Sequence, residues 1–207
     1  MRNFISEDDI EQAILQKLEG DPFQYGILRC DPSPDKRELL PDGTGRSSKK
    51  ECVLPLILRE ALARLNPDIP GEKLEEIARD LCRDFSATDM TATNYKYYNQ
   101  IRNGIKISLR RNGKEDFDFV KLVDFDRPEN NTFTAVSQMW IQGRVYWRRP
   151  DVLIFINGLP MVFVELKNSI VNYESLTANE KENIRATMDR VTPHILWEGW
   201  NTEWENS

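Results

Sequence analysis

The sequence predicts an α+β fold in which helices come first and a mostly antiparallel sheet follows. Apolar residues recur at helical spacing in several segments before Gly104. After Gly104 the pattern changes to the alternation of apolar and polar residues that is typical of strands. Helices followed by successive strands favour α+β over alternating βα units. With 207 residues the chain can bury one good core, so we expect a single domain over residues 1–207.

Within this domain we expect a helical part at about 50–103, a sheet at about 104–168 and a tail at 169–207. One further helix precedes these parts. It begins after Ser6, whose hydroxyl suits an N-cap, and Ile10, Ile14 and Leu18 form its apolar stripe. Glu11 borders this stripe, a position where a glutamate is more often solvated than buried.

The helical part should hold helices at 51–65, 71–85 and 94–102, with the break Asn66-Pro-Asp-Ile-Pro70 between the first two. Residues 30–50, rich in Pro, Asp, Gly and Ser, predict a long loop. Its segment Gly43-Thr-Gly-Arg-Ser-Ser-Lys-Lys50 is superficially similar to a phosphate loop. It lacks a Gly directly before the Lys and no clear strand precedes it, so we do not interpret it as an ATP site.

Strands are predicted at 105–109 and 117–125, joined by a turn at 111–114, and a third strand at 132–142. Beyond residue 168, the pattern predicts a helix at 178–191 and a very short strand at 194–197.

The stretch of residues 148–167 predicts a β-hairpin. Two apolar runs, 152–156 and 161–164, flank Asn157-Gly158, the strongest short hairpin signal. Because both runs are apolar at nearly every position, we expect both strands to be covered on two faces. Asp151 precedes the first strand, and Glu165 and Lys167 close the second.

Folding this hairpin gathers two carboxylates and one ammonium group at one end of an apolar ribbon. If Ile156 pairs with Pro160, Asp151 lies opposite Glu165; a loop two residues longer places Asp151 opposite Lys167. Taken alone, either pair is more often part of a simple salt bridge. However, two close carboxylates repel each other unless a cation lies between them, and such hard oxygen ligands suit Mg²⁺.

Five segments resemble the N-terminal nuclease region of the R (restriction) subunit of type I restriction–modification enzymes. They are Ile5-Ser-Glu-Asp-Asp-Ile-Glu11, Leu58-Arg-Glu-Ala-Leu-Ala-Arg-Leu-Asn-Pro67, Val123-Asp-Phe-Asp-Arg-Pro-Glu-Asn-Asn131, Arg148-Arg-Pro-Asp-Val-Leu153, and Asn157-Gly-Leu-Pro160 leading into Val164-Glu-Leu-Lys-Asn168. Pro-Asp followed, after a strand and a turn, by Glu-x-Lys is the PD-(D/E)xK nuclease signature. The resemblance therefore implies a restriction-endonuclease-like core with a mixed, mostly antiparallel sheet flanked by helices, plus an inserted helical segment.

The resemblance also implies a Mg²⁺-dependent endonuclease that cuts double-stranded DNA without sequence specificity of its own. ATP would be used only by motor domains that this chain lacks, and methyltransferase and specificity subunits would be partners. Asp151, Glu165 and Lys167 match the catalytic triplet of the family, with Asp151 and Glu165 as the metal ligands. A glutamate on the first helix often joins such sites, and Glu11, ahead of Glu7, is the candidate here. A rival interpretation is a non-catalytic DNA-positioning or subunit-docking module that retains a remnant nuclease site.

The net charge of −6 does not by itself indicate a nucleic-acid-binding protein. Arg144, Arg148 and Arg149, however, run directly into Asp151, and we interpret them as candidate contacts to DNA phosphates. A solvated charged face is the more common explanation of such a cluster. Its place beside the candidate site favours the DNA interpretation.

Several other classes of protein are disfavoured. No apolar run approaches the ~20 residues of a membrane span, and the N-terminus lacks a signal peptide, so we expect a cytoplasmic protein without a membrane partner. Cys30, Cys52 and Cys82 are odd in number and form no Cys-x-x-Cys, which indicates neither disulfides nor a thiolate zinc site. With His194 as the only histidine, a Ser–His–Asp mechanism has little support.

Overall fold

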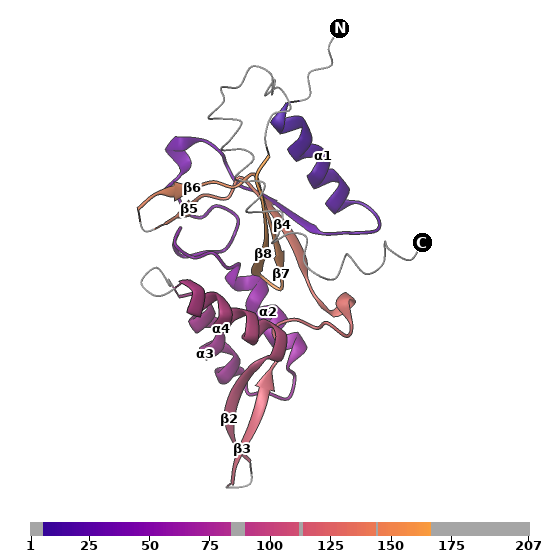
Figure 1. Ribbon diagram of the computed structural model, residues 1–207, viewed down its shortest axis with the longest axis vertical. Coiled ribbons are helices and arrows are strands. Elements are labelled where there is room, and N and C mark those ends of the chain that lie inside the picture. The colour runs from indigo at the N-terminus through magenta and orange to yellow at the C-terminus, as the bar shows by residue number, and fades with distance from the viewer. Residues whose placement is uncertain (1–5, 84–89, 112–113, 144, 167–207) are drawn as a thin grey trace. The chain divides into compact units, whose positions relative to one another are not determined.

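The computed structural model describes residues 6–83, 90–111, 114–143 and 145–166. Contacts divide the chain into one unit of residues 8–166 and another of residues 1–7 with 167–207. The described residues belong almost entirely to the first unit, which is drawn in colour in Figure 1. The helix predicted at 178–191 and the strand predicted at 194–197 lie outside the described residues.

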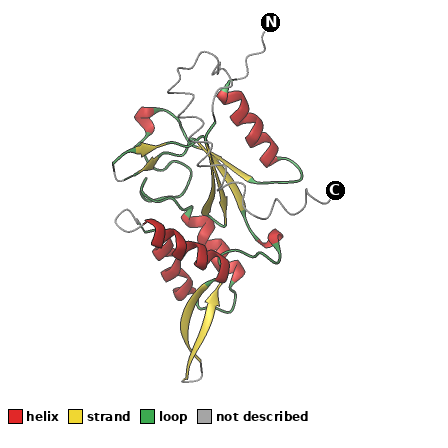
Figure 2. Ribbon diagram, in the orientation of Figure 1, coloured by secondary structure: helices red, strands yellow, loops and turns green. Residues whose placement is uncertain are grey.

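The α+β prediction is confirmed for the described part of the chain (Figure 2). Its α-helices are α1 (Glu7–Glu19), α2 (Pro55–Leu65), α3 (Gly71–Leu81) and α4 (Met90–Asn103). Its strands are β1 (Gly26–Arg29), β2 (Ile105–Arg111), β3 (Lys114–Val120), β4 (Phe133–Ser137), β5 (Ile141–Gln142), β6 (Trp147–Arg148), β7 (Val152–Ile156) and β8 (Leu159–Val164). None of these described helices is long and apolar enough to span a membrane.

The main sheet is mixed, with strand order β1-β4-β7-β8. β1 runs parallel to β4, whereas the β4–β7 and β7–β8 pairs are antiparallel, which confirms the mostly antiparallel prediction. The sequence pattern did not reveal β1. The single strand predicted at 132–142 is wrong, because the chain leaves β4 at Gln138, whose φ of 56° is incompatible with a continuing strand.

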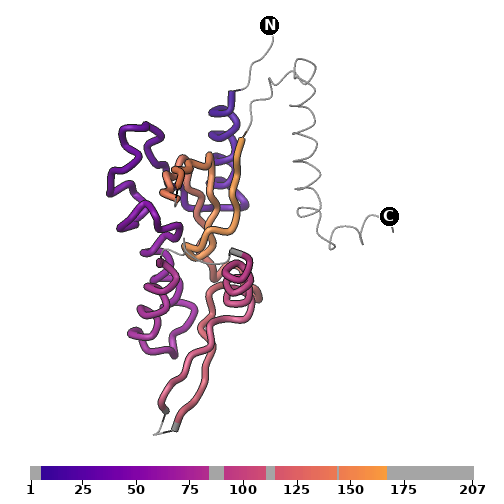
Figure 3. The backbone as a smooth tube through the Cα atoms, turned by 60° about the vertical axis from the view of Figure 1, so that its left-hand side comes forward, coloured from indigo at the N-terminus to yellow at the C-terminus, as the bar shows by residue number. Residues whose placement is uncertain are grey.

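β2 and β3 form a separate antiparallel ribbon rather than further strands of the main sheet. Two views show this ribbon extending from the α2–α4 helices, away from the four-stranded sheet (Figures 1 and 3). The strand predicted at 117–125 ends early, at Val120. There the Asn66 side chain accepts from the Lys121 amide and donates to the Lys121 carbonyl oxygen, which ties the end of the ribbon to the end of α2.

α2 and α3 follow their apolar patterns closely. Pro55 occupies the first turn of α2, where its missing N–H leaves no bond unmade. α3 buries four apolar residues at helical spacing against α2 and the β2–β3 ribbon: Leu74, Ile77, Ala78 and Leu81. These helices form a second core beside the main sheet.

Different kinds of structure cover the two faces of the main sheet. α1 packs Leu15 against Ala135 and Val152 on one face. On the other face, Leu153 and Phe155 pack against the ends of the segment 30–54, which holds no α-helix. Within the described residues, α1 thus covers one face and α2 contributes the half-buried Ile57 to the cluster on the other, so the expectation that helices flank the sheet is confirmed in part.

A buried ion cluster consolidates the segment 30–54. Asp42 Oδ2 accepts from Arg46 at 2.6 Å and from Lys49 at 2.8 Å, and Asp42 Oδ1 accepts from the Thr44 hydroxyl. Arg46 also donates to the Trp140 carbonyl oxygen at 3.1 Å, so the cluster fastens the loop to the chain beyond β4. Two basic side chains of the stretch similar to a phosphate loop are thus satisfied within the protein.

The two strands of the predicted hairpin differ in burial. β7 is buried or half-buried along its whole length, as predicted. On β8, Met161, Val162 and Phe163 are exposed within the described structure, so the prediction that both strands are covered on two faces is wrong for β8. β8 is the edge strand of the described sheet, which explains its greater exposure.

Candidate active site

Asp151 lies directly before β7, at the end of the sheet where β4, β7 and β8 are neighbours. Its Oδ2 accepts a hydrogen bond of 2.5 Å from the Leu166 amide just beyond β8. Its backbone carbonyl oxygen accepts a hydrogen bond of 3.0 Å from the backbone N–H of Gln138, just beyond β4. The half-buried carboxylate is therefore oriented by the chain on both sides of it.

Glu165 reaches this end of the sheet because of a β-bulge. The two-residue turn pairs Ile156 with Leu159, and the ladder then skips Met161. Continued by one residue beyond its last pair, the shifted register places Glu165 opposite Asp151. If Met161 were instead paired in an unshifted ladder, Asp151 would lie opposite Val164 and Glu165 would point to the other face, since successive side chains on a strand alternate. The structure thus favours the first of the two predicted arrangements, with a tighter turn and a bulge.

Glu11 is buried at the centre of the inward face of α1. Its side chain is 5 % exposed, and Leu15, one turn later, is fully buried. The expected stripe residues Ile10 and Ile14 are only half-buried. The solvated interpretation of Glu11 is therefore wrong, because the buried face centres on Glu11 and Leu15. Glu7, the second candidate on this helix, is exposed.

The environment of Glu11 favours its protonated form. Burial raises the pKa of the Glu11 carboxyl above its ordinary value, and the negative charges of Asp151 and Asp8 raise it further. A hydrogen bond from Gln138 and the positive charge of Arg149 act in the opposite direction without cancelling the rise. Glu11 and Asp151 are therefore close enough to repel each other.

Gln138 connects these two acids, and the sequence pattern did not single it out. Its Nε2 donates to Glu11 Oε2 and lies 3.4 Å from Asp151 Oδ1. One weak signal was present, because Ser137 and Gln138 are adjacent polar residues in an otherwise apolar stretch. Nothing local, however, indicated that the strand ends there.

The described residues bring together two pairs of acids rather than one compact cluster. Gln138 joins Glu11 to Asp151, and the β7–β8 register, continued by one residue beyond its last pair, brings Glu165 level with Asp151. No group of three or more Asp, Glu, His or Cys side chains within the described residues is close enough to hold a metal ion. The donors nevertheless fit Mg²⁺, which is commonly held by one or two carboxylates plus water. Lys167 lies outside the described residues.

Two of the three predicted DNA-binding arginines are described, and both are exposed. Arg149 donates to the Pro32 carbonyl oxygen at 2.6 Å, and its guanidinium lies 5.1 Å from the Trp140 ring centroid. Arg148 lies 5.5 Å from the Tyr146 ring centroid. Arg149 is thus held close to the Glu11–Asp151 pair, and Arg144 lies outside the described residues.

Residues 4–190 match the family model of the type I restriction enzyme R protein N terminus. The chain belongs to this family. The matched span contains Glu11, Gln138, Asp151, Glu165 and Lys167, so the candidate site lies wholly within it.

Two relatives show which proteins this chain is similar to. The type I restriction enzyme HindI endonuclease subunit of Haemophilus influenzae is 32 % identical over 167 residues, which is 80 % of this chain and 15 % of the relative. A putative type I restriction enzyme endonuclease subunit, MjaIXP, of Methanocaldococcus jannaschii is 27 % identical over 194 residues, or 90 % of this chain and 17 % of the relative. The chain therefore corresponds to a small part of these proteins.

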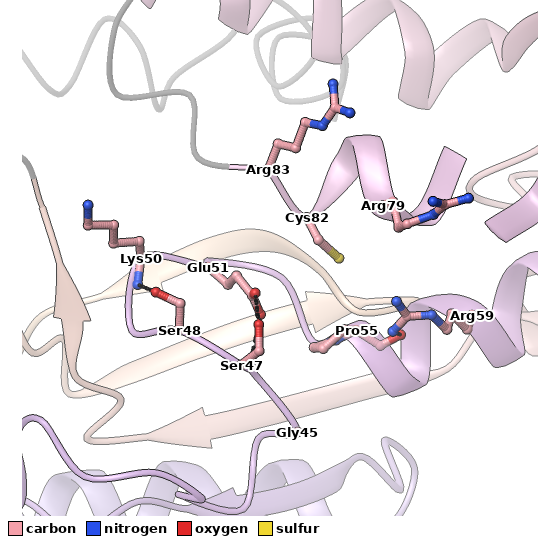
Figure 4. Close-up of a pocket in the computed structure, with 10 residues that line it drawn as sticks. All are labelled: Gly45, Ser47, Ser48, Lys50, Glu51, Pro55, Arg59, Arg79, Cys82 and Arg83. Carbon is pink, nitrogen blue, oxygen red and sulfur yellow. Dashed lines mark hydrogen bonds between the residues drawn. The ribbon is translucent and has the colours of Figure 1, made fainter. Parts of the chain in front are cut away.

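A cavity of about 440 Å³ lies elsewhere in the chain, between the segment 45–51, the first turns of α2 and the end of α3 (Figure 4). Arg59, Arg79 and Arg83 line it, but each pairs with an acid of α3. Arg59 binds Glu75 at 2.9 Å, Arg79 lies 3.9 Å from the same carboxylate, and Arg83 lies 3.3 Å from Asp80. None of the candidate site residues lines this cavity.

Proposed function

We propose that this R-protein N terminus is a Mg²⁺-dependent endonuclease domain that hydrolyses phosphodiester bonds of double-stranded DNA without sequence specificity of its own. The observation that carries the proposal is the β7–β8 register, whose continuation by one residue brings Glu165 level with Asp151 at one end of the hairpin. Membership of a restriction-enzyme family supports it. We infer a PD-(D/E)xK core, with residues 1–207 as one nuclease-like domain.

Asp151 and Glu165 would hold the Mg²⁺ ion. When bound there, the ion would lower the pKa of a water molecule and offset negative charge on the phosphate. The Leu166 amide, which donates to Asp151 Oδ2, leaves Oδ1 on the side of Gln138 and so fixes how the carboxylate is presented. Lys167 would orient the attacking water or stabilise charge in the transition state.

Glu11 would serve as a third acid at this site. Because its carboxyl is buried beside Asp151, it binds a proton more readily than an ordinary glutamate. A nearby cation would favour the ionised form by offsetting the repulsion between the two acids. We therefore propose that Glu11 supports the site rather than acting as a solvated surface residue.

Arg144, Arg148 and Arg149 would contact DNA phosphates at the rim of the site. Phosphate contacts position DNA without reading its sequence, which agrees with cleavage that is not sequence-specific. In the complete enzyme we propose methyltransferase and specificity subunits as partners, ATP use by other domains, and a cytoplasmic location.

Cation binding tests the proposal. We expect the 207-residue chain to bind Mg²⁺ or Mn²⁺ in calorimetry, and Asp151→Asn to abolish the binding because it removes a ligand charge. Asp68→Asn is the matched control, since Asp68 is exposed near the end of α2. Binding that is absent, or that is unaffected by Asp151→Asn, would reject the nuclease proposal in favour of a DNA-positioning or subunit-docking module.

A further inference from the structure

The side chain of Gln138 lies between two acids from distant parts of the chain. Glu11 comes from α1 and Asp151 from the start of β7, and the Gln138 amide group is within hydrogen-bonding distance of both. Continuation of the β4–β7 register places Gln138 opposite Asp151, just as Glu165 lies opposite Asp151 on the other side. Gln138, Asp151 and Glu165 therefore form one row across the end of the sheet.

The ionisation of the two acids determines how the side-chain amide must be oriented. When both carboxylates are ionised they can only accept hydrogen bonds, so the NH₂ group of Gln138 then faces Glu11 and Asp151, as it does in the structure. One of its two hydrogens is available for each acid. This orientation leaves Gln138 Oε1 buried without a hydrogen-bond partner among the described residues. A buried acceptor without a donor costs folding free energy. An apolar side chain of similar size would fill the space without this cost, so packing alone does not explain an amide at this position.

The backbone of Gln138 is also in an unfavourable conformation. Its φ of 56° lies in the left-handed region, which costs a residue other than glycine roughly 1–3 kcal/mol. Such strain persists where the surrounding structure holds it, often at functional sites. Here the backbone N–H of Gln138 donates to the Asp151 carbonyl oxygen at 3.0 Å, and the side-chain NH₂ group lies within reach of the Asp151 carboxylate. The backbone and the side chain of Gln138 therefore both hold the Asp151 segment.

We propose that Gln138 is a positioning residue of the cation site, whose two amide hydrogens hold the Glu11 and Asp151 carboxylates side by side. The cation part of this inference rests on the proposed function. Gln138 would act before a cation binds, by placing a hydrogen-bond donor where two negative charges would otherwise meet. Glu11 would then be presented to the same ion as Asp151 without rearrangement of α1.

NMR of the metal-free, ¹⁵N-labelled chain tests whether the side-chain amide of Gln138 contacts both acids. The signals of its two side-chain amide hydrogens are identified as those lost in Gln138→Met. We expect Glu11→Met to shift one of these hydrogens strongly and Asp151→Asn to shift the other. If Glu11→Met leaves both signals unchanged, the amide does not hold the two acids and the proposal is wrong. If Gln138→Met does not fold, replacing each of the other glutamines in turn assigns the Gln138 signals by elimination, so the comparison can still be made.

The affinity for Mn²⁺ tests whether Gln138 positions the cation ligands. Replacing a residue that orients a metal ligand typically weakens binding 10- to 100-fold, so we expect Gln138→Met to weaken Mn²⁺ binding about 10-fold. Gln142→Met is the matched control, since Gln142 is exposed on β5, and it should bind as the wild type does. Because Gln138 is proposed to hold Glu11 beside Asp151, Gln138→Met should cost less Mn²⁺ affinity in the Glu11→Met background than in the wild type, so the two losses should not add.

The outcomes separate this inference from the proposed function. A lower melting temperature of metal-free Gln138→Met with unchanged Mn²⁺ affinity would assign Gln138 a structural role only and overturn the proposal. Additive losses in the double variant would also overturn it, since Gln138 would then act independently of Glu11. If the wild type binds no cation through Asp151, the proposed function fails, and the proposed role of Gln138 in cation binding fails with it. The signals of the side-chain amide still decide whether Gln138 holds the two acids.

Discussion

The Leu54 amide donates a 2.9 Å hydrogen bond to the Gly158 carbonyl oxygen, which joins the start of α2 to the turn of the candidate-site hairpin. This turn is buried rather than exposed. The Asn157 side chain is fully buried, accepting from the Thr132 amide at 2.8 Å and donating to the Leu122 carbonyl oxygen at 2.9 Å. The turn of the hairpin, which lies at the far end from Asp151, is therefore anchored in the protein core.

Gly158→Ala should destabilise the fold. Gly158 has a φ of +80°, and an added Cβ would lie 2.6 Å from the Leu54 carbonyl oxygen and 2.8 Å from the Leu58 amide nitrogen. Left-handed strain and backbone overlap together should cost at least about 2 kcal/mol of unfolding free energy in urea denaturation. Gly71→Ala, where an added Cβ meets nothing within 4 Å, should change stability by less than about 1 kcal/mol. Equal effects of the two changes would contradict the anchored turn.

Asp42→Asn should destabilise the protein at neutral pH but not in acid. Burial alone raises the pKa of Asp42, but hydrogen bonds from Lys49, Thr44 and Arg46 outweigh burial and hold the pKa well below its ordinary value. A lowered carboxyl pKa stabilises the fold above the unfolded-state value of about 4, and this stability is lost as the pH falls towards the folded-state value. The wild type and Asp42→Asn should therefore differ at pH 7 and converge progressively below about pH 4.

Urea denaturation at several pH values measures this difference, with Asp126→Asn at an exposed site as the control. A difference between wild type and Asp42→Asn that persists unchanged into acid would show that the ion cluster does not depend on the ionised Asp42 carboxylate.

Glu11→Gln should stabilise the metal-free protein at neutral pH. The pKa of Glu11 is raised in the folded state, chiefly by burial, so wild-type stability falls as the pH rises from about 4 through the folded-state pKa. Glutamine cannot ionise and avoids this loss. Thermal melts in the presence of a chelator should show the gain at pH 7 and little difference at pH 4. Glu7→Gln on the exposed face of α1 is the control, and a loss of stability in Glu11→Gln at pH 7 would contradict the repulsion between Glu11 and Asp151.

Asp151→Ala, Glu165→Ala and Lys167→Ala should each abolish DNA cleavage by the assembled restriction enzyme while the fold remains intact. The first two remove proposed cation ligands, and the third removes the proposed positive charge at the transition state. Cleavage of plasmid DNA and circular dichroism of each variant are the measurements. Wild-type cleavage by any one variant would remove that residue from the proposed catalytic set.

Duplex DNA should bind the isolated chain weakly and without sequence preference. Replacing Arg148 and Arg149 by glutamine should weaken binding, and the slope of log K against log[salt] should fall by roughly 1 for each phosphate contact removed. Lysine at both positions keeps the charge and should retain most of the affinity. Fluorescence anisotropy in a salt series measures this, and binding that survives high salt would exclude phosphate contact as its main source.

The parts of the fold that were predicted correctly depend on local patterns. The hairpin turn at Asn157-Gly158 and the helices α2 and α3 are determined by neighbouring residues, and all three lie close to their predicted places. β1 was missed because its four residues, Gly26–Arg29, show no alternation and depend on pairing with β4.

The interior of the candidate site could not be predicted in the same way. Glu11 and Gln138 are 127 positions apart, so no spacing along the chain indicates their contact. The apolar stripe of α1 suggested that Glu11 lies at an edge, because acids are rarely buried. The long loop predicted at 30–50 is present, but its composition did not indicate that Arg46 and Lys49 are buried within it, because their partner Asp42 is recognised only in the folded segment.

The bulge at Met161 restricts how the hairpin can vary in length. Because side chains alternate along a strand, deleting one paired residue of β7 while the bulge is kept would bring Val164 level with Asp151 and turn Glu165 to the other side of the ribbon. Met161 is the exception, because it has no partner in the ladder, and its deletion would leave a regular hairpin with Glu165 still level with Asp151. Among designed variants of this chain, deletion of Met161 should therefore keep both acids together, whereas deletion of the paired Val152 should take them out of register.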